Sequence, residues 1–213
     1  RARLTFGLGE DLPIIYVTGG ALGAHAINEA MRHALPHMLA FAQVIHQCGP
    51  ESVNGDLTRL RQAAAALPDT LRARYVLRET LRDELADVYA AATLVIGRAG
   101  AGTVSELAVL GKPSILIPLP GAGGDEQTAN ASTLATHHAA VLLPQSELTP
   151  ERLIADVRAL LSEPDRLAMM GARAREVGRP DPAEHLATAV LDLARTKGLV
   201  QRSQTTLGPQ ARG

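Results

Sequence analysis

The chain has 213 residues, of which 46% are hydrophobic and 20% charged, as expected for one globular domain and not for a disordered or fibrous protein. A net charge of −1 gives no general attraction for nucleic acid, so we expect no nucleic-acid partner and only local phosphate sites. One cysteine, Cys48, excludes an internal disulfide and a multi-thiolate metal site, and indicates a reducing compartment such as the cytoplasm. The chain begins at Arg1 without an initiator methionine, so we expect it to be part of a longer protein.

Short β-branched runs alternate with longer helical patterns along the first two thirds of the chain. The predicted strands are 14–18, 43–46, 74–77, 94–97, 114–118 and 140–143, and the predicted helices between them lie near 24–35, 57–67, 83–91, 103–110 and 126–136. This alternation is typical of βαβ units with a parallel sheet buried on both faces. We therefore predict an α/β fold with a Rossmann-like, doubly wound parallel sheet.

The last third of the chain changes character after Pro144. Three helical patterns follow, near 150–162, 165–177 and 182–195, and each begins at or beside a proline. Residues 197–213 have no periodic apolar positions. We therefore expect one domain over residues 1–196, followed by a flexible tail over 197–213.

Glycine-rich turns follow three of the predicted strands. The first contains Gly19, Gly20, Ala21 and Gly23, and it leads into a helix. A turn without bulky side chains lets a diphosphate approach the main chain, although a simple tight strand-to-helix turn explains the glycines equally well.

The second turn, after strand 94–97, gives the stronger signal. Gly100 and Gly102 permit a phosphate-binding loop, Thr103 offers a hydroxyl, and the Glu106 carboxylate can accept from both hydroxyls of a ribose. Thr103-x-x-Glu106 also fits a capping box, which would only satisfy the start of the helix. Because Gly100-x-Gly102-x-x-Ser105 is one glycine short of a dinucleotide fingerprint, a nicotinamide-dependent oxidoreductase remains an alternative.

The third turn leads from residue 120 into the helix near 126–136. Gln127 and Asn130 share a helix face, so their amides and the carboxylate of Asp125 can meet a polar ligand such as a sugar. The alternative is a glycine-rich loop with Asp125 as a helix N-cap. Asp125 and Glu126 have no third ligand at a suitable spacing, so we predict no metal site.

In this order and spacing the three turns resemble the C-terminal domain of glycosyltransferase family 28, over about residues 10–195. The stretches that match are Thr18-Gly19-Gly20-x-x-Gly23-Ala24-x-x-x-Asn28, His46-Gln47-x-Gly49, Tyr89-Ala90-Ala91-Ala92, Arg98 to Leu107 and Gly124-Asp125-x-Gln127-Thr128-x-Asn130-Ala131. The resemblance implies the C-terminal, donor-binding half of a GT-B fold that holds UDP-N-acetylglucosamine. It further implies an inverting transferase without metal or other cofactor, which converts lipid I to lipid II in peptidoglycan synthesis.

The resemblance also implies roles for individual residues. The segment from Ala101 through Gly102, Thr103, Val104 and Ser105 would face the diphosphate and the sugar, and Glu106 would hold the ribose. Gln127 would bind sugar hydroxyls with Asp125, Glu126 and Asn130 around it, while Leu81 and Arg82 would lie against the uracil. The sequence departs from the family at two places: Ala21 replaces a serine that contacts phosphate, and Leu81-Arg82 replaces Phe-Ile.

The family places the general base and the acceptor site in the N-terminal half, so we assign no catalytic residue to this chain and expect it to be inactive alone. A lipid-linked acceptor would put the whole enzyme on the cytoplasmic face of the inner membrane. Two alternatives remain open. The chain is either a separate subunit that needs a partner with the acceptor site, or part of a related GT-B transferase with another lipid or aglycone acceptor.

Overall fold

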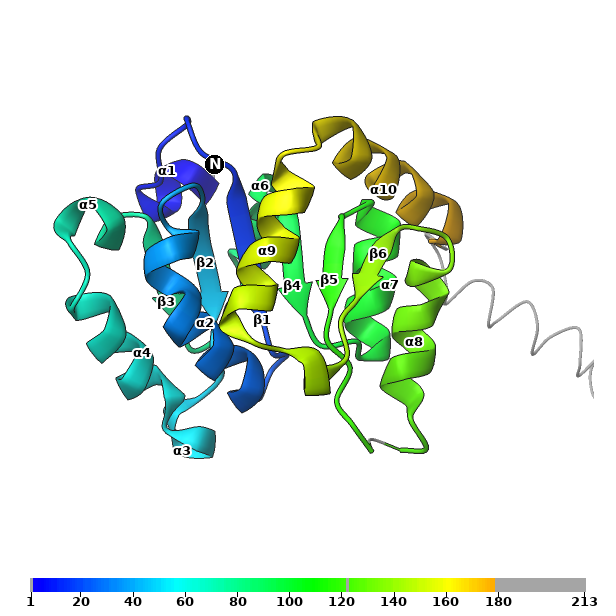
Figure 1. Ribbon diagram of the computed structural model, residues 1–213, viewed down its shortest axis with the longest axis horizontal. Coiled ribbons are helices and arrows are strands. Elements are labelled where there is room, and N and C mark those ends of the chain that lie inside the picture. The colour runs from blue at the N-terminus through cyan, green and yellow to red at the C-terminus, as the bar shows by residue number, and fades with distance from the viewer. Residues whose placement is uncertain (1, 122, 179–213) are drawn as a thin grey trace, which may run out of the picture. The chain divides into compact units, whose positions relative to one another are not determined.

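The structure is a computed structural model that describes residues 2–121 and 123–178 (Figure 1). The helix predicted near 182–195, the domain end at residue 196 and the predicted tail over 197–213 lie outside these residues.

Six parallel strands form one sheet in the order β3-β2-β1-β4-β5-β6, which confirms the predicted doubly wound fold. The strands are β1 (Ile14–Thr18), β2 (Gln43–Gln47), β3 (Tyr75–Arg78), β4 (Leu94–Gly97), β5 (Ser114–Leu116) and β6 (Ala140–Leu142). All residues of β1, β2, β4 and β5 are buried, as expected for strands covered on both faces.

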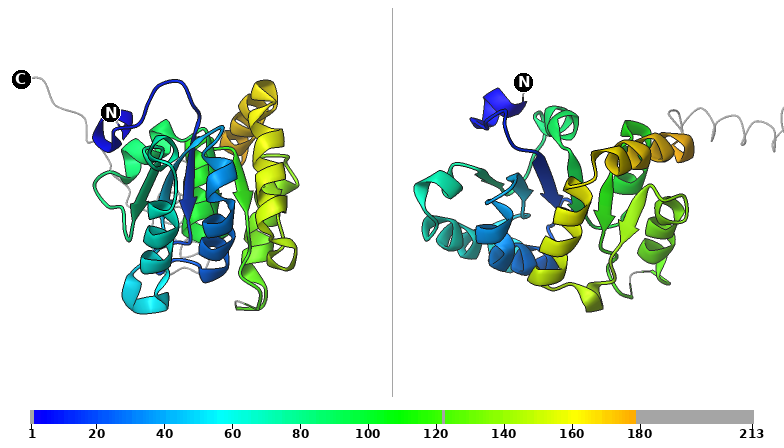
Figure 2. Two further views of the ribbon diagram at one scale, coloured as in Figure 1. Left: turned by 60° about the vertical axis from the view of Figure 1, so that its left-hand side comes forward. Right: turned by 45° about the horizontal axis from the view of Figure 1, so that its top comes forward.

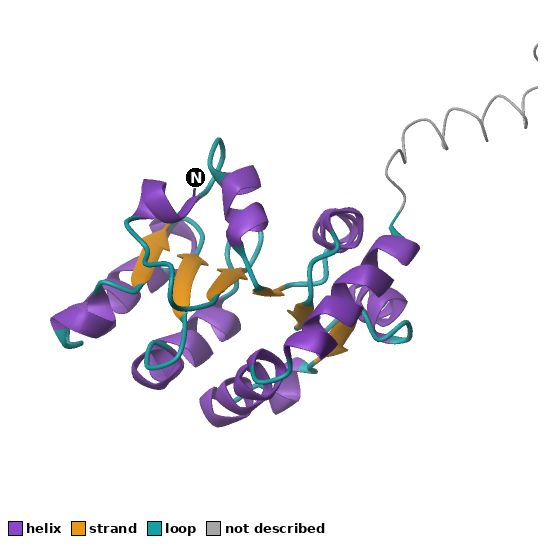
Figure 3. Ribbon diagram, turned by 90° about the horizontal axis from the view of Figure 1, so that it is seen from above, coloured by secondary structure: helices purple, strands orange, loops and turns teal. Residues whose placement is uncertain are grey.

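Helices cover both faces of this sheet (Figures 2 and 3). The α-helices are α1 (Ala2–Phe6), α2 (His25–Met38), α3 (Glu51–Asn54), α4 (Asp56–Ala65), α5 (Asp69–Arg72), α6 (Leu85–Ala91), α7 (Ala101–Leu110), α8 (Glu126–Ala135), α9 (Pro150–Leu161) and α10 (Pro164–Val177), with a 3₁₀ helix at Gln145–Glu147. Within the described residues, no helix has both the length and the apolar character needed to cross a membrane.

The core consists of two main apolar clusters, one on each face of the sheet. Alternate residues of β1 divide between them, because successive strand side chains point to opposite faces. Ile15 and Val17 pack against α2 and α9, whereas Ile14 and Tyr16 pack on the side of α6, α7 and α8.

The predicted elements agree with the observed ones except at their ends and in the shortest helices. Helix α2 continues to Met38 with Pro36 in its last turn, where the sequence predicted an end near Leu35. The short helices α1, α3 and α5 were not predicted, because four or five residues are too few to show a helical period.

Candidate functional site

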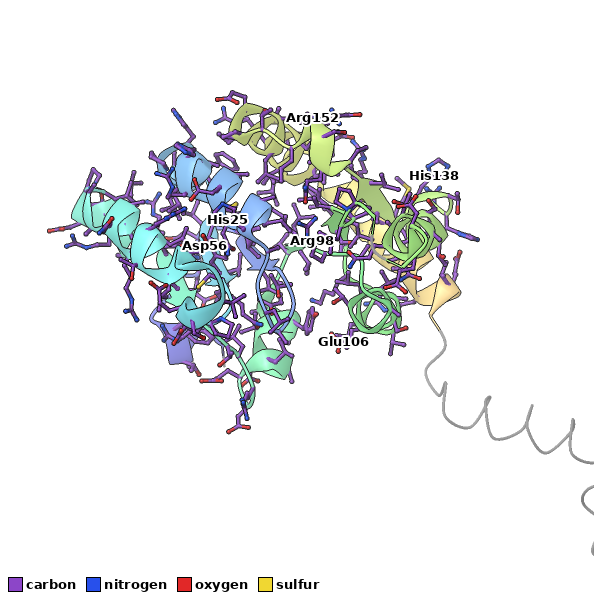
Figure 4. The ribbon with its side chains drawn as sticks, turned by 90° about the horizontal axis from the view of Figure 1, so that it is seen from below. His25, Asp56, Arg98, Glu106, His138 and Arg152 are labelled. Carbon is purple, nitrogen blue, oxygen red and sulfur yellow. The ribbon has the colours of Figure 1, made fainter. Side chains whose placement is uncertain are left out.

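A pocket of about 620 Å³ lies where β1 and β4 end. This end of the sheet is its lower edge in Figure 1, and Figure 4 views the molecule from that side. These two neighbouring strands are the point at which the strand order reverses, and open α/β sheets bind ligands at this point. The pocket is lined by Gly19, Gly20, Ala21, Leu22, Gly23, Ala24, His25, Ala26, Arg98, Gly100, Thr103, Leu119, Gln127 and Gln145. No acidic side chain of the described residues lines it.

The first glycine turn is fixed by its own hydrogen bonds and by close backbone packing. The Gly20 amide donates to Thr18 Oγ1 at 3.1 Å, and Gln47 Nε2 donates to the Gly20 carbonyl at 3.2 Å. Gly23 has a φ of +76°, and a Cβ there would lie 2.0 Å from the Cys48 carbonyl oxygen. Gly49 has a φ of +86°, and a Cβ there would lie 2.4 Å from the Leu22 carbonyl oxygen. Packing therefore explains Gly23, while the turn as a whole forms one wall of the pocket.

Two helices begin at the pocket without a side-chain cap. In α2 the first helical bond runs from the Asn28 amide to the Ala24 carbonyl, and in α7 it runs from the Val104 amide to the Gly100 carbonyl. The backbone amides of the first turns have no partner among the described residues; they belong to His25, Ala26, Ile27, Ala101, Gly102 and Thr103. Uncapped helix N-termini attract anions, and two of them face this pocket.

The capping-box alternative for Thr103 and Glu106 is wrong. Helix α7 has its N-cap at Gly100, which places Thr103 inside the first turn and Glu106 in the second. The Glu106 side chain is exposed and accepts a hydrogen bond from Tyr89 Oη at 2.9 Å. Burial, followed by the charge of Glu106, raises the pKa of Tyr89, so this hydroxyl remains a donor.

Arg98 is the buried cation of the pocket. Its guanidinium donates to the carbonyls of Ile117 and Pro118 at 3.0 and 3.1 Å, and to Gln145 Oε1 at 2.6 Å. It forms no salt bridge with a carboxylate in the described part of the chain, and burial lowers its pKa. Sequence reasoning gave Arg98 no role, because its partners are 19 to 47 residues away along the chain.

The third turn contributes only one of its predicted residues to the pocket. Gln127 lines it and accepts from the Leu119 amide through Oε1 at 3.0 Å. Asn130 Nδ2 donates to the Ala99 carbonyl at 3.1 Å and so holds the loop that precedes α7. Asp125 occupies the N-cap position of α8, but its carboxylate accepts from Thr128 Oγ1 and not from a backbone amide. Asp125 and its exposed neighbour Glu126 lie outside the pocket lining.

The segment predicted to meet the base precedes α6. The Leu81 side chain is buried in the same apolar cluster as Tyr89 and Val104, so it leaves the main chain of the segment for any ligand. Arg82 is exposed, as is Ser105 on α7. Leu81, Arg82, Ser105 and Glu106 are outside the pocket lining, although Ser105 and Glu106 belong to α7, whose Thr103 lines the pocket.

A buried chain of polar side chains leads from the core to the rim of the pocket. His46 contacts Tyr75 Oη through Nδ1 and Asn28 Oδ1 through Nε2, each at 2.9 Å, and burial lowers its pKa to about 3. Asn28 Nδ2 donates to Asp56, which in turn binds His25. Sequence reasoning missed Asp56 and His25, since nothing local indicates that they meet. No group of three potential metal ligands occurs among the described residues.

The glycosyltransferase family 28 C-terminal domain matches residues 14–186. The chain belongs to this family. A UDP-N-acetylglucosamine–N-acetylmuramyl-(pentapeptide) pyrophosphoryl-undecaprenol N-acetylglucosamine transferase of Rhodopseudomonas palustris is 40% identical, over 84% of the chain and 47% of the relative. A protein of the same name from Alkalilimnicola ehrlichii is 38% identical, over 89% of the chain and 51% of the relative.

Solved structures agree with this assignment. The crystal structure of Acinetobacter baumannii MurG superposes with a TM-score of 0.70 at 33% identity, over 85% of this chain and 52% of that one. The chain therefore has the C-terminal Rossmann-like half of a GT-B fold, and it spans about half the length of the curated relatives it matches. Family membership also removes the nicotinamide oxidoreductase alternative.

Proposed function

We propose that this chain is the donor-binding half of a transferase that moves N-acetylglucosamine from UDP-N-acetylglucosamine to a lipid-linked muramoyl-pentapeptide acceptor, which converts lipid I to lipid II. One observation carries the proposal: two uncapped helix N-termini and the buried Arg98 meet in a pocket that no described acidic side chain lines. Such a pocket favours a diphosphate, and the names of the 38–40% identical relatives supply the donor and acceptor.

The pocket fits the electrostatic demand of an inverting transfer. An acceptor hydroxyl attacks the anomeric carbon, the bond from that carbon to the diphosphate breaks, and the hydroxyl proton passes to a base. Negative charge then develops on the departing UDP. Oriented amides of α2 and α7 and the Arg98 guanidinium are fixed before the reaction, so they can stabilise this charge without reorganising. In the proposal these groups fill the role that a metal ion has in other transferases.

The remaining predicted residues would bind the ribose, the sugar and the uracil of the donor. Glu106 keeps one carboxylate oxygen beyond the one bonded to Tyr89, which is available for ribose hydroxyls. The amide nitrogen of Gln127 has no hydrogen bond within the described residues, so it can donate to the sugar. The main chain at Leu81 and Arg82 would meet the uracil.

The rest of the enzyme lies outside this chain in the proposal. A base and an acceptor site would come from an N-terminal half, or from a partner subunit if the chain is naturally separate. We place the whole enzyme in the cytoplasm, on the inner face of the inner membrane, because its acceptor would be anchored there by undecaprenol. A related GT-B transferase with another lipid or aglycone acceptor is the competing assignment, and acceptor assays with the complete enzyme distinguish the two.

Glu106→Gln tests the donor site. Glutamine keeps an acceptor for Tyr89 but loses the charge, so the fold should be unaffected while ribose binding weakens. We expect the affinity for UDP-N-acetylglucosamine, measured by calorimetry, to fall about 5- to 10-fold. Glu151→Gln, an exposed glutamate at the start of α9, is the matched control. Equal affinity in wild type, Glu106→Gln and the control would remove Glu106 from the site.

A further inference from the structure

An acid–histidine pair stands at the rim of the pocket and has no role in the function proposed above. His25 Nδ1 lies 2.7 Å from Asp56 Oδ1. The Asp56 side chain is 1% exposed, whereas that of His25 is 55% exposed and lines the pocket. A buried carboxylate thus orients an imidazole that can reach a ligand.

The Asp56 carboxylate of this pair is fixed by its position in α4 and by a hydrogen bond from Asn28. Asp56 is the first residue of the ten-residue helix α4, where the helix dipole favours a negative charge. Its second oxygen accepts from Asn28 Nδ2 at 2.8 Å, and the same nitrogen donates to the Cys48 carbonyl at 2.9 Å. Asn28 must therefore offer its oxygen to His46, which completes a buried chain that fixes the Asp56 carboxylate.

The free nitrogen of His25 faces away from Asp56. Nδ1 is occupied by the carboxylate, and Nε2 is on the other side of the ring, without a partner among the described residues. Figure 4 shows Asp56 and His25 next to each other, with His25 on the side of Arg98. His25 is also the first residue of α2, and His25 and Ala26 of its uncapped first turn both line the pocket.

We propose that His25 is a further donor-binding residue, which donates a hydrogen bond from Nε2 to the diphosphate of the nucleotide sugar while Asp56 holds Nδ1. This inference rests on the proposed function. An imidazole whose Nδ1 hydrogen points to Asp56 presents a lone pair at Nε2 when neutral. It can donate to phosphate only after it takes up one proton from the solvent, and it becomes an imidazolium between two anions.

Charged groups of both signs surround His25. Asp56 from α4 and Glu29 from α2 are negative and favour a charged imidazole. Arg59 of α4 lies 3.9 Å from Glu29, and Arg98 faces the same pocket; both are positive. A bound diphosphate adds negative charge on the open side. When the sugar leaves, the imidazolium is placed to stabilise the charge that develops on UDP.

Three variants test the proposal with UDP as the ligand. His25→Gln removes the charge, and His25→Arg keeps a cation that does not titrate. His33→Gln is the matched control, because His33 lies on the same helix with 56% of its side chain exposed and does not line the pocket. Calorimetry at pH 7.5 in two buffers with different ionisation enthalpies gives both the affinity and the number of protons taken up.

We expect His25→Gln to bind UDP about 5- to 10-fold more weakly than wild type and to lose most of the proton uptake. His25→Arg should restore affinity without proton uptake, and His33→Gln should match wild type in both. The terminal phosphate of UDP also titrates, near pH 6, but equally in every variant. If His25→Gln binds UDP and takes up protons as wild type does, the inference is wrong while the proposed function stands. If wild type binds no UDP, the proposed function itself is refuted.

Discussion

Replacing Arg98 by methionine separates the two contributions of this side chain, to the fold and to the donor site. Methionine has a similar length without charge or donors, so the buried carbonyls of Ile117 and Pro118 lose their partner. An unsatisfied buried acceptor costs about 1–3 kcal/mol. Removing a buried charge that has no carboxylate partner in the described residues offsets part of this cost. We expect the free energy of unfolding without ligand to fall by about 1–3 kcal/mol.

The same substitution should also weaken the binding of UDP. A hydrogen bond to a charged partner contributes about 1.5–3 kcal/mol, which is roughly 10- to 100-fold in affinity. At a UDP concentration 100 times the wild-type Kd, the ligand stabilises the wild type by about 2.7 kcal/mol. A variant with 30-fold weaker affinity gains about 0.9 kcal/mol at the same concentration. For a domain of this size, the rise in Tm with UDP should shrink from about 8 °C to about 3 °C.

Thermal unfolding with and without UDP measures both effects in one experiment. Arg61→Met, at an exposed position of α4, is the control and should show the wild-type rise in Tm. The reasoning fails if Arg98→Met is stabilised by UDP as much as the control is. It also fails for the fold if Arg98→Met is as stable as wild type without ligand.

Two further predictions concern pH and the departure at Ala21. Burial lowers the pKa of His46 from 6.5 to about 3, so below pH 6.5 the unfolded chain takes up a proton that the folded chain does not. The free energy of unfolding should therefore decline by up to about 1.4 kcal/mol per pH unit as the pH falls from 6.5 towards 3. Urea titrations should show a shallower decline for His46→Gln, and equal slopes would contradict this reading. Ala21→Ser adds a hydroxyl to the pocket wall, and its hydrogen bond to phosphate should contribute about 1 kcal/mol. Calorimetry should therefore give about fivefold tighter UDP binding. An unchanged Kd would show that residue 21 does not contact phosphate.

The fold could be predicted from the sequence to within a few residues at most element ends. Each of the six strands is a short run with at least one β-branched residue, and each of the first five is followed by a helical period. The short helices α3 and α5 carry no such period, and the start of α7 was misplaced because Thr103 and Glu106 fit a capping box by chance. A local pattern cannot reveal that the helix has already begun at Ala101.

The site could be predicted only where its residues directly follow a strand in the sequence. Glycine turns after strands pointed to Gly19, Gly20, Ala21 and Gly23 and to Thr103 and Gln127, all of which line one pocket. The long-range contacts could not be found in this way. Arg98 bonds to carbonyls of the β5 end and to Gln145, and Asp56 reaches His25 across 31 residues of sequence. The arrangement of the folded chain brings these residues together, and a single sequence does not indicate which distant residues are in contact.

The close packing of Gly23 against Cys48 and of Gly49 against Leu22 has a consequence for how the ligand is received. Neither backbone can move outward without carrying its neighbour, so the glycine turn over residues 19–23 is held against the end of β2 by the fold itself. The entropy of ordering this loop is lost during folding and not again at each encounter. A turn that is already ordered would bind the proposed diphosphate with little rearrangement of this wall of the pocket.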